Sequence, residues 1–272
     1  MRSAITVSLV PETKAGPFVF SDGLDDAFSK AKELGFDAVE IFPRSASELD
    51  VAVVSRLTDR YALRVAAVGT GAGWVVHKLA LTHADPAIRR KASDFVKSII
   101  EVAGGWAAPA IIGSMQGRWE GTVTRELALE YLGDALEELG KHAAGFGVSL
   151  LYEPLNRYET NLFNRLGETT AWLRGRGLAH VRILADLFHM NIEEANSAAA
   201  LREAGALIGH VHFADSNRRA VGMGQTAMEP IIEALRAMKY AGYLSAEVFP
   251  LPDPMAAARQ TISAFRKYTA TR

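Results

Sequence analysis

The sequence predicts a parallel α/β fold with eight strands and eight helices, a (β/α)8 TIM barrel. Eight short apolar runs of β type alternate with helical patterns along the 272 residues, and such alternation is typical of a parallel sheet. Eight repeats in roughly 250 residues is also the usual size of this barrel. No linker or low-complexity segment divides the chain, so we expect a single domain over residues 1–272. An open doubly wound sheet is the alternative, but no glycine-rich phosphate loop follows the first run.

Each predicted strand is followed by a predicted helix. The strands cover residues 4–10, 36–42, 64–69, 110–114, 148–154, 181–189, 208–215 and 243–249. Two helix starts are marked by an aspartate before a proline, because aspartate caps a helix N-terminus and proline fits its first turn. Asp85 begins a helix over residues 85–102, and Asp253 begins the last one. Residues 124–146 carry a leucine-rich stripe at helical spacing, and Gly35 ends the first helix.

Four ionisable residues lie at or near the ends of the last four predicted strands. They are Glu153, Asp186, His212 and Glu247. Active sites of such barrels lie at the C-terminal ends of the strands, and counting back by twos places each residue on the barrel-facing side. Carboxylates brought to one point repel one another unless a divalent cation neutralises them. Three carboxylates and one imidazole suit Mn²⁺ or Mg²⁺ better than thiophilic ions, so the pattern predicts a metal site.

Each of these residues also has a simpler structural interpretation. Glu153 could pair with a barrel arginine such as Arg182, since an unpaired buried carboxylate is costly. Asp186 could cap the helix that follows it, and His212 alone would more often be a hydrogen-bonded core histidine. Glu247 could be an ordinary carboxylate at a strand end. The four residues together favour the metal site over four separate explanations.

Composition and charge exclude several classes of partner. The 30 basic and 31 acidic residues give a net charge of -1, which offers no electrostatic basis for binding nucleic acid or an anionic membrane. No run approaches the roughly 20 apolar residues of a membrane span, and the apolar stretch near the N-terminus is too short for a signal sequence. The chain has no cysteine, hence no disulfide or thiolate ligand. A cytoplasmic location is the default expectation.

Four ordered motifs carry a resemblance to a known family. They are YEPLNRYETN (152–161), ADLFHMNIEE (185–194), HVHFADSNR (210–218) and AEVF (246–249). With these motifs the chain resembles the xylose isomerase-like barrel superfamily, and within it the ketose 3-epimerases, the D-tagatose and D-psicose 3-epimerase group. The resemblance implies that Glu153, Asp186, His212 and Glu247 bind one divalent metal ion, with Mn²⁺ expected first and Co²⁺, Mg²⁺ and Zn²⁺ as further candidates.

The resemblance also implies roles for residues around the metal. Glu153 and Glu247 would be the catalytic acid/base pair as well as ligands. Glu159, His189 and Arg218 would hold the hydroxyls and the carbonyl of the substrate, and one more residue, Trp119, stands where the family often has an aromatic wall. Dimers or tetramers are expected from the same resemblance.

The first half of the chain departs from the family pattern. Relatives bring aromatic residues from the first strand to the sugar, whereas residues 5–11 read ITVSLVP and Phe18 and Phe20 come only further along. Because strands and loops of this half shape the pocket, the sequence leaves the identity of the sugar open.

The chemistry that these residues allow is proton transfer next to a carbonyl. A bound metal ion would stabilise an enediolate, and two glutamates on different strands could remove a proton from one face and return one to the other. The predicted function is metal-dependent epimerisation of a ketose at C3 through a cis-enediolate, on a small sugar or keto-polyol.

Other functions on the same scaffold stay open. A lyase such as a keto-inositol or dehydroshikimate dehydratase would use the same proton abstraction, and so would a hydroxypyruvate or other aldose-ketose isomerase. A DNA repair enzyme like endonuclease IV needs several zinc ions, more histidines and a basic groove, and seven histidines with a net charge of -1 argue against it. A noncatalytic sugar-binding barrel is the last alternative.

Overall fold

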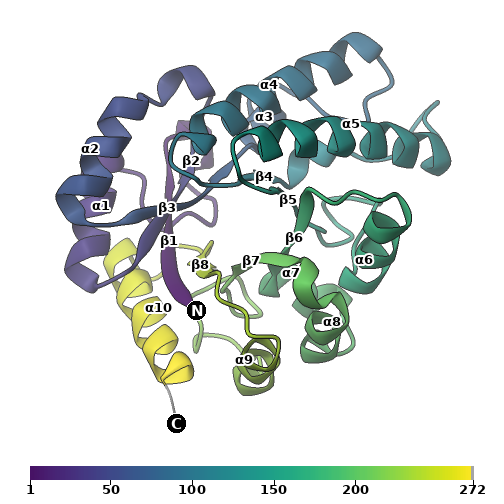
Figure 1. Ribbon diagram of the computed structural model, residues 1–272. Coiled ribbons are helices and arrows are strands. Elements are labelled where there is room, and N and C mark those ends of the chain that lie inside the picture. Colours follow the sequence, from purple (N-terminus) through teal and green to yellow (C-terminus); the bar gives the residue numbers. More distant parts are fainter. Residues whose placement is uncertain (271–272) are drawn as a thin grey trace.

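The strands form a closed parallel barrel in the computed structural model, which describes residues 1–270. They are β1 (Arg2–Ser8), β2 (Ala38–Phe42), β3 (Arg64–Gly69), β4 (Ala110–Ile112), β5 (Leu150–Tyr152), β6 (Val181–Asp186), β7 (Ile208–His212) and β8 (Tyr243–Ala246). Each pairs with the next, and β8 pairs with β1, so the barrel has no free sheet edge. Figure 1 shows the strands at the centre with the helices around them. The predicted (β/α)8 barrel is confirmed.

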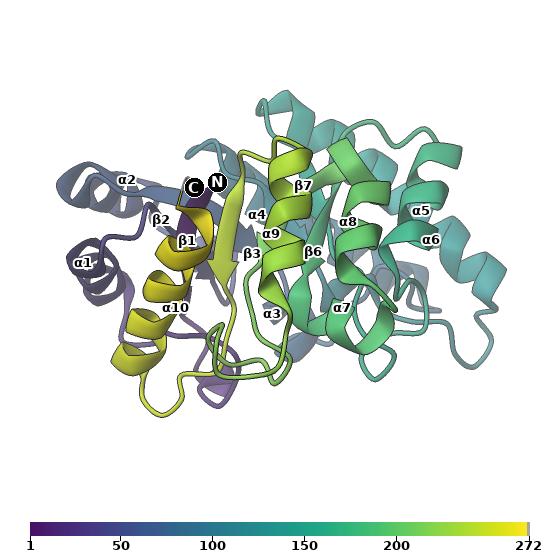
Figure 2. The same cartoon turned by 90° about the horizontal axis from the view of Figure 1, so that it is seen from below.

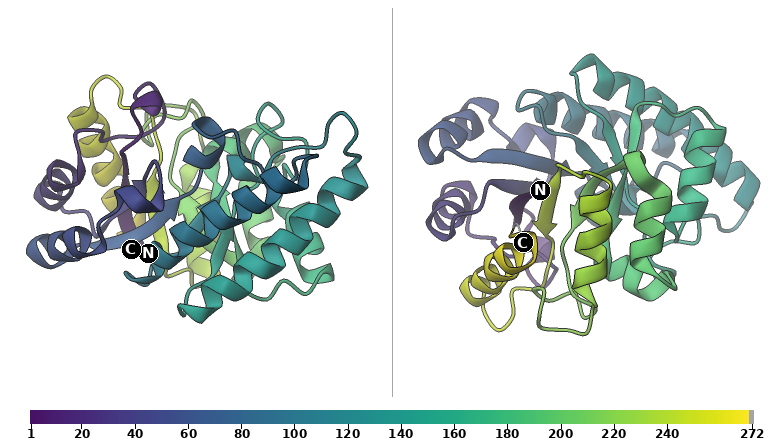
Figure 3. Two further views of the ribbon diagram at one scale, coloured as in Figure 1. Left: turned by 90° about the horizontal axis from the view of Figure 1, so that it is seen from above. Right: turned by 60° about the horizontal axis from the view of Figure 1, so that its bottom comes forward.

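Helices surround the barrel, as the three further views in Figures 2 and 3 also show. They are α1 (Leu24–Leu34), α2 (Val51–Tyr61), α3 (Ala72–Val75), α4 (Pro86–Gly104), α5 (Arg125–Gly145), α6 (Leu166–Gly175), α7 (Leu187–Glu193), α8 (Ser197–Ala204), α9 (Met228–Ala237) and α10 (Pro254–Thr269). As predicted, Asp85 and Asp253 cap α4 and α10 by accepting backbone N–H groups. Within residues 1–270, no helix combines the length and the apolar character needed to cross a membrane.

The apolar core has an outer and an inner part. The outer part fills the space between strands and helices and includes Ile5, Val39, Ile112 and Ile183. The inner part is small and lies inside the barrel, where Ala67, Ile111, Leu151 and Leu184 from β3 to β6 form a cluster. Side chains of a strand alternate between its two faces, so the residues two positions beyond Leu151 and Leu184 also face the barrel. These are Glu153 and Asp186, as the sequence pattern predicts.

Several strands end earlier than predicted, and this places the site residues at the rim of the barrel. Asp186 and His212 are the last residues of β6 and β7, and they are directly paired in the register. Glu153 follows the last residue of β5, and Glu247 follows the last residue of β8. All four side chains therefore start from the same C-terminal level of the barrel.

Candidate metal centre and active site

Glu153, Asp186, His212 and Glu247 converge on one point. One carboxylate oxygen of each acid and one ring nitrogen of the histidine all lie within 4.8 Å of one another. Glu153, Asp186 and His212 are buried, and the side chain of Glu247 is 14% exposed. Residues from four different strands thus form a single cluster, which we call the quartet.

The Nδ1 atom of His212 faces all three acids of the quartet. It lies 3.2 Å from Oδ2 of Asp186, 3.4 Å from Oε1 of Glu153 and 3.7 Å from Oε2 of Glu247. The other ring nitrogen, Nε2, points into the barrel and lies 3.0 Å from Oε1 of Glu40. Nδ1 of this histidine therefore faces the three acids of the quartet, and Nε2 faces Glu40.

The donor set of the quartet fits a divalent cation. Oε1 of Glu153 is buried and has no hydrogen-bond partner within residues 1–270, although it faces the other members of the quartet. A buried polar atom without a partner is costly unless something outside the chain contacts it. Three carboxylates and one imidazole are ligands for ions of the Mn²⁺, Mg²⁺ or Zn²⁺ type. The quartet is a candidate site for one divalent metal ion.

The contacts of Asp186 and Glu153 test the simpler structural roles considered for these two residues. Asp186 does cap a helix, because its Oδ1 accepts from the backbone N–H of Phe188 at 2.7 Å at the start of α7. Its Oδ2 is left for the quartet, so the cap and the ligand use different oxygens. The alternative pairing of Glu153 with Arg182 is wrong, because Arg182 instead donates to the carbonyl oxygen of Ala206.

Burial and mutual contacts dominate the electrostatics of the quartet. Burial by itself raises the pKa of Asp186, but His189 and His212 together bring it below its usual range. Burial raises the pKa of Glu247, and Arg218 and His212 oppose this only in part. For His212, burial lowers the pKa, whereas Glu40 and Glu247 raise it well above its usual value. The carboxylates thus favour a positive charge at their centre, which a metal ion would supply in place of a proton.

The three predicted substrate-binding residues Glu159, His189 and Arg218 lie beside the quartet. The Arg218 guanidinium pairs with Oε2 of Glu247 and lies 3.7 Å from Oε1 of Glu159. It also stacks over the Phe188 ring, 4.8 Å from the ring centroid. Nε2 of His189 lies 3.9 Å from Oε1 of Glu153. All three therefore face the same space as the metal ligands.

Hydrogen bonds to Nδ1 decide which ring nitrogen of His189 carries the proton. The backbone N–H of Asn156 lies 3.3 Å from this atom, and the amide nitrogen of the same residue lies 2.7 Å away. A backbone N–H can only donate, so Nδ1 is the acceptor and the ring hydrogen of the neutral form is on Nε2. Nε2 is buried without a hydrogen-bond partner among residues 1–270. His189 thus directs a free N–H group into the site.

Trp119 is not brought to the site. Its side chain is 40% exposed and is held by Asn161, whose carbonyl oxygen accepts from the indole Nε1 at 3.0 Å. It does not line the cavity above the quartet. The aromatic residues that do line it are Phe18, Phe42 and Trp74.

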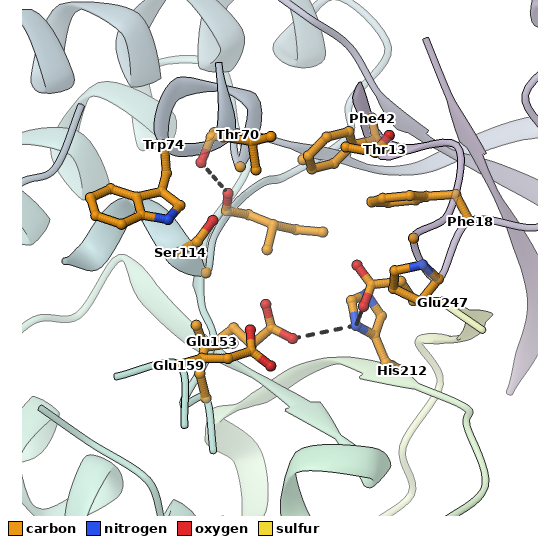
Figure 4. Close-up of a pocket in the computed structure, with 18 of the residues that line it drawn as sticks. Thr13, Phe18, Phe42, Thr70, Trp74, Ser114, Glu153, Glu159, His212 and Glu247 are labelled. Carbon is orange, nitrogen blue, oxygen red and sulfur yellow. Dashed lines mark hydrogen bonds and ion pairs between the residues drawn. The ribbon is translucent and has the colours of Figure 1, made fainter. Parts of the chain in front are cut away.

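The cavity has a volume of about 600 Å³ and two chemically different ends. Figure 4 shows the acidic residues and His212 at one end, with Phe18 and Phe42 on one side of the opposite end and Trp74 on the other. The Phe18 and Phe42 ring centroids are 4.5 Å apart. A Cβ at Gly69 would lie 2.7 Å from the Phe42 ring, so this glycine leaves room for the ring.

Phe18 reaches the cavity because the chain folds back along β1. The backbone N–H of Phe20 donates to the carbonyl oxygen of Thr6 at 3.1 Å, and the N–H of Ser8 donates to that of Phe20 at 2.9 Å. The segment around Phe20 therefore lies side by side with the end of β1. The aromatic wall that the first strand itself lacks is supplied by this returning segment.

Sequence reasoning missed Glu40, Phe42 and Trp74. The signal for Glu40 was a carboxylate inside an apolar strand, which needs a partner when it is buried. The two aromatic residues gave no such signal, because an aromatic residue at a strand end or in a helix is most often packing.

The fold and the quartet define a class of protein: a barrel enzyme with a candidate divalent metal site at the C-terminal ends of its strands. Residues 28–268 match the family model of the xylose isomerase-like TIM barrel. The chain belongs to this family, and the resemblance seen in the four sequence motifs is confirmed.

Two curated relatives show the kind of chemistry in this family. The 3-dehydro-D-guloside 4-epimerase of Escherichia coli (strain K12) is 30% identical over 253 residues, which cover 91% of this chain and 95% of the relative. The L-ribulose 3-epimerase of Methylomonas sp. (strain DH-1) is 31% identical over 231 residues, covering 84% of this chain and 79% of the relative. Because such relatives are epimerases, the protein is an enzyme of the isomerase class.

Solved structures agree with the fold. A crystal structure of 3-keto-D-glucoside 4-epimerase from E. coli superposes with a TM-score of 0.82 at 25% identity and covers 98% of this chain and 100% of that one. A D-allulose 3-epimerase from Methylomonas sp. superposes with a TM-score of 0.81 at 24% identity and covers 98% of both chains.

Proposed function

We propose that the protein epimerises a ketose at C3 with one divalent metal ion, preferably Mn²⁺, held by the quartet. The observation that supports this most directly is the placement of Glu153 and Glu247. They come from β5 and β8, and a carboxylate oxygen of each lies within 4.8 Å of the other ligand atoms. Two carboxylates that reach one point from different strands can act as acid and base on one substrate carbon.

The chemistry divides between the ion and the two glutamates. A divalent ion bound in the quartet would act as a Lewis acid that stabilises the enediolate formed next to a carbonyl. Glu153 and Glu247 would then remove the C–H proton on one face and deliver a proton on the other.

His189, Arg218 and Glu159 would orient the sugar. The free Nε2–H of His189 is a donor for a substrate oxygen near the ion, because Asn156 donates to Nδ1 and no group within residues 1–270 accepts from Nε2. The Arg218 guanidinium pairs with Glu247 and would polarise the oxygen of the reacting carbonyl system. Glu159 keeps an oxygen at the cavity, where it can accept from a hydroxyl.

A second candidate is epimerisation of a keto-glycoside at C4. The same proton abstraction next to a carbonyl serves this reaction. Two observations favour it: this chain spans 95% of the 4-epimerase but 79% of the L-ribulose 3-epimerase, and the cavity ends in Phe18, Phe42 and Trp74. An aromatic end suits the extra group that a glycoside carries, because flat apolar rings bind the faces of sugars and other apolar groups.

Turnover of a substrate panel in deuterated water separates these functions. Ketoses, keto-glycosides, keto-inositols and hydroxypyruvate would each be incubated with the Mn²⁺-loaded enzyme, and the products identified by NMR. A product with inverted configuration and deuterium at the inverted carbon supports epimerisation and names C3 or C4. An aldehyde product would identify an aldose-ketose isomerase, and a new enone absorbing in the ultraviolet would identify a lyase. Cytoplasmic location and a dimer or tetramer stay predictions of the sequence.

A further inference from the structure

Glu40 is a buried carboxylate that the proposed reaction does not use. It lies in the middle of β2, on the inside of the barrel, and is 5% exposed. Oε2 of Glu40 lies 2.7 Å from Nε2 of His210, and Oε1 lies 3.0 Å from Nε2 of His212. Each carboxylate oxygen therefore has its own histidine, and one of the two histidines is a member of the quartet.

This arrangement fixes the hydrogen positions on His212. An ionised carboxylate only accepts hydrogen bonds, so the nitrogen that faces Glu40 must carry a hydrogen. A neutral imidazole carries one ring hydrogen, and placing it on Nε2 leaves a lone pair on Nδ1. Nδ1 is the atom that lies 3.2 to 3.7 Å from the three acids of the quartet. The tautomer that Glu40 selects is thus the one that can bind a metal ion.

We propose that Glu40 is a positioning residue, which holds His212 in the tautomer and orientation needed to bind the metal ion. The inference rests on the proposed metal site. Glu40 lines the inner part of the cavity, but its two carboxylate oxygens face His210 and His212, so it acts through His212. His210 holds the second oxygen of Glu40 and so keeps the carboxylate aligned with the His212 ring.

A metal ion among Glu40, His210 and His212 is the competing interpretation, because their ligand atoms also lie within 4.8 Å of one another. The distances favour hydrogen bonding. Both nitrogen-oxygen separations, 2.7 and 3.0 Å, are those of N–H donors and carboxylate acceptors. In addition, each oxygen of Glu40 already faces one histidine nitrogen at hydrogen-bond distance.

Metal affinity without substrate tests the proposal directly. Mn²⁺ dissociation constants would be measured by titration calorimetry for the wild type, Glu40→Leu and Glu40→Gln. The leucine removes both acceptor oxygens at similar size, and we expect a loss of about 10–100-fold, as found for residues that orient histidine ligands. The glutamine keeps one acceptor oxygen, so its loss should be smaller. Should the leucine variant fail to fold, the glutamine variant alone decides through the same measurement.

A matched control separates positioning from general destabilisation. Glu194→Gln also replaces a partly buried carboxylate, but Glu194 accepts from the backbone N–H of Leu166 at 2.7 Å and contacts no histidine of the site. Its Mn²⁺ affinity should equal that of the wild type. Equal affinities for wild type and Glu40→Leu, within threefold, would overturn the proposal.

The tautomer itself can be observed. In metal-free ¹⁵N-labelled protein, long-range ¹H–¹⁵N correlations should place a ring hydrogen of His212 on Nε2 in the wild type. Loss of this fixed Nε2 hydrogen in Glu40→Leu supports the proposal, whereas an Nε2 without a hydrogen in the wild type would overturn it. Two Mn²⁺ ions per chain, one of them lost in Glu40→Leu, would instead show that Glu40, His210 and His212 bind a metal ion. Neither readout depends on turnover, so an incorrect substrate or reaction leaves the test intact.

Discussion

The missing side chain of Gly113 leaves the space that the carboxylate of Glu153 occupies. Gly113 follows the last residue of β4, and a Cβ built on it would lie 2.5 Å from Oε2 of Glu153. The backbone N–H of Glu153 donates to the carbonyl oxygen of Ile112 at 2.9 Å, so the two strand ends are held together at this point. The position of a metal ligand on one strand thus depends on a glycine on its neighbour.

Gly113→Ala should therefore disturb the metal site more than the fold. The added methyl group would displace the Glu153 carboxylate, and a displacement of about 1 Å at a reacting group can cost 10²-fold in rate. We expect at least a tenfold loss of kcat/KM and weaker Mn²⁺ binding, measured by steady-state kinetics and calorimetry. Gly175→Ala is the control, because a Cβ there meets nothing within 4 Å. Equal kinetics for both variants would contradict the steric argument.

Glu153→Gln and Glu247→Gln should each stop proton exchange at the substrate carbon. An amide cannot accept the proton, and loss of one acid/base group costs about 10²–10⁴-fold. The measurement is deuterium incorporation from D₂O together with turnover, with the metal content of each variant determined in parallel. Glu168→Gln, at a carboxylate in the first turn of α6 outside the cavity, provides the control. An epimerised product that contains no solvent deuterium would rule out the two-base scheme.

Removal of the metal ion should abolish activity and lower stability. Chelation followed by readdition of Mn²⁺ should restore turnover, and a ligand at 100 times its Kd stabilises the folded state by about 2.7 kcal/mol. The free energy of unfolding in urea, with and without Mn²⁺, measures this gain. Asp186→Asn retains an oxygen that can cap α7 but loses a charged ligand. We expect that variant to fold with little gain from Mn²⁺; a full gain would show that Asp186 is not a ligand.

Trp74→Ala should weaken substrate binding, whereas Trp119→Ala should not. Trp74 lines the cavity, and Trp119 is held outside it by Asn161. Losing an apolar contact of this size costs about 1–2 kcal/mol, which corresponds to a KM raised roughly 5- to 30-fold. The effect should be largest for the bulkier substrate if a keto-glycoside is used. Steady-state kinetics of both variants on a ketose and a keto-glycoside check this, and a larger effect of Trp119→Ala would restore the role that the sequence predicts for it.

The buried carboxylate of Glu193 should make the stability of the protein depend on acid pH. It accepts from the backbone N–H of Arg157 at 2.7 Å and pairs with its guanidinium at 2.9 Å, and these contacts lower the pKa of Glu193. A carboxylate whose pKa is lower in the folded than in the unfolded state stabilises the folded protein at pH values above its unfolded pKa. This stabilisation is lost as the pH falls through the pKa of the folded state. Glu193→Gln should thus cost about 1–3 kcal/mol at pH 7.

Denaturant unfolding from pH 7 down to pH 3 measures that dependence. The difference in free energy of unfolding between wild type and Glu193→Gln should shrink below a pH of about 4.3, where an unperturbed glutamate takes up its proton. A difference that stays constant over this range would show that the contribution of Glu193 does not come from its charge.

Local signals in the chain were sufficient for the fold. Helix ends are marked by local residues, namely Asp85, Asp253 and Gly35. Short apolar runs alternate with helical stripes, and this pattern is also local, so the sequence shows both directly. The strand ends were less predictable. Val148 and Ser149 continue the apolar pattern of the fifth strand, but the paired part starts at Leu150, because its neighbours β4 and β6 determine how far pairing extends.

The sequence by itself determined the barrel and the four residues of the quartet, because strand alternation and the common C-terminal level of parallel strands follow from periodicity. Only the tertiary structure decided what surrounds them. Glu40 meets His212 across 172 positions of the chain, and Phe18 meets Phe42 through a segment that folds back on β1. Contacts of this kind depend on barrel closure and loop path, which bring together residues that no local pattern connects. The same reason explains why Trp119, plausible as a wall in the sequence, lies outside the cavity.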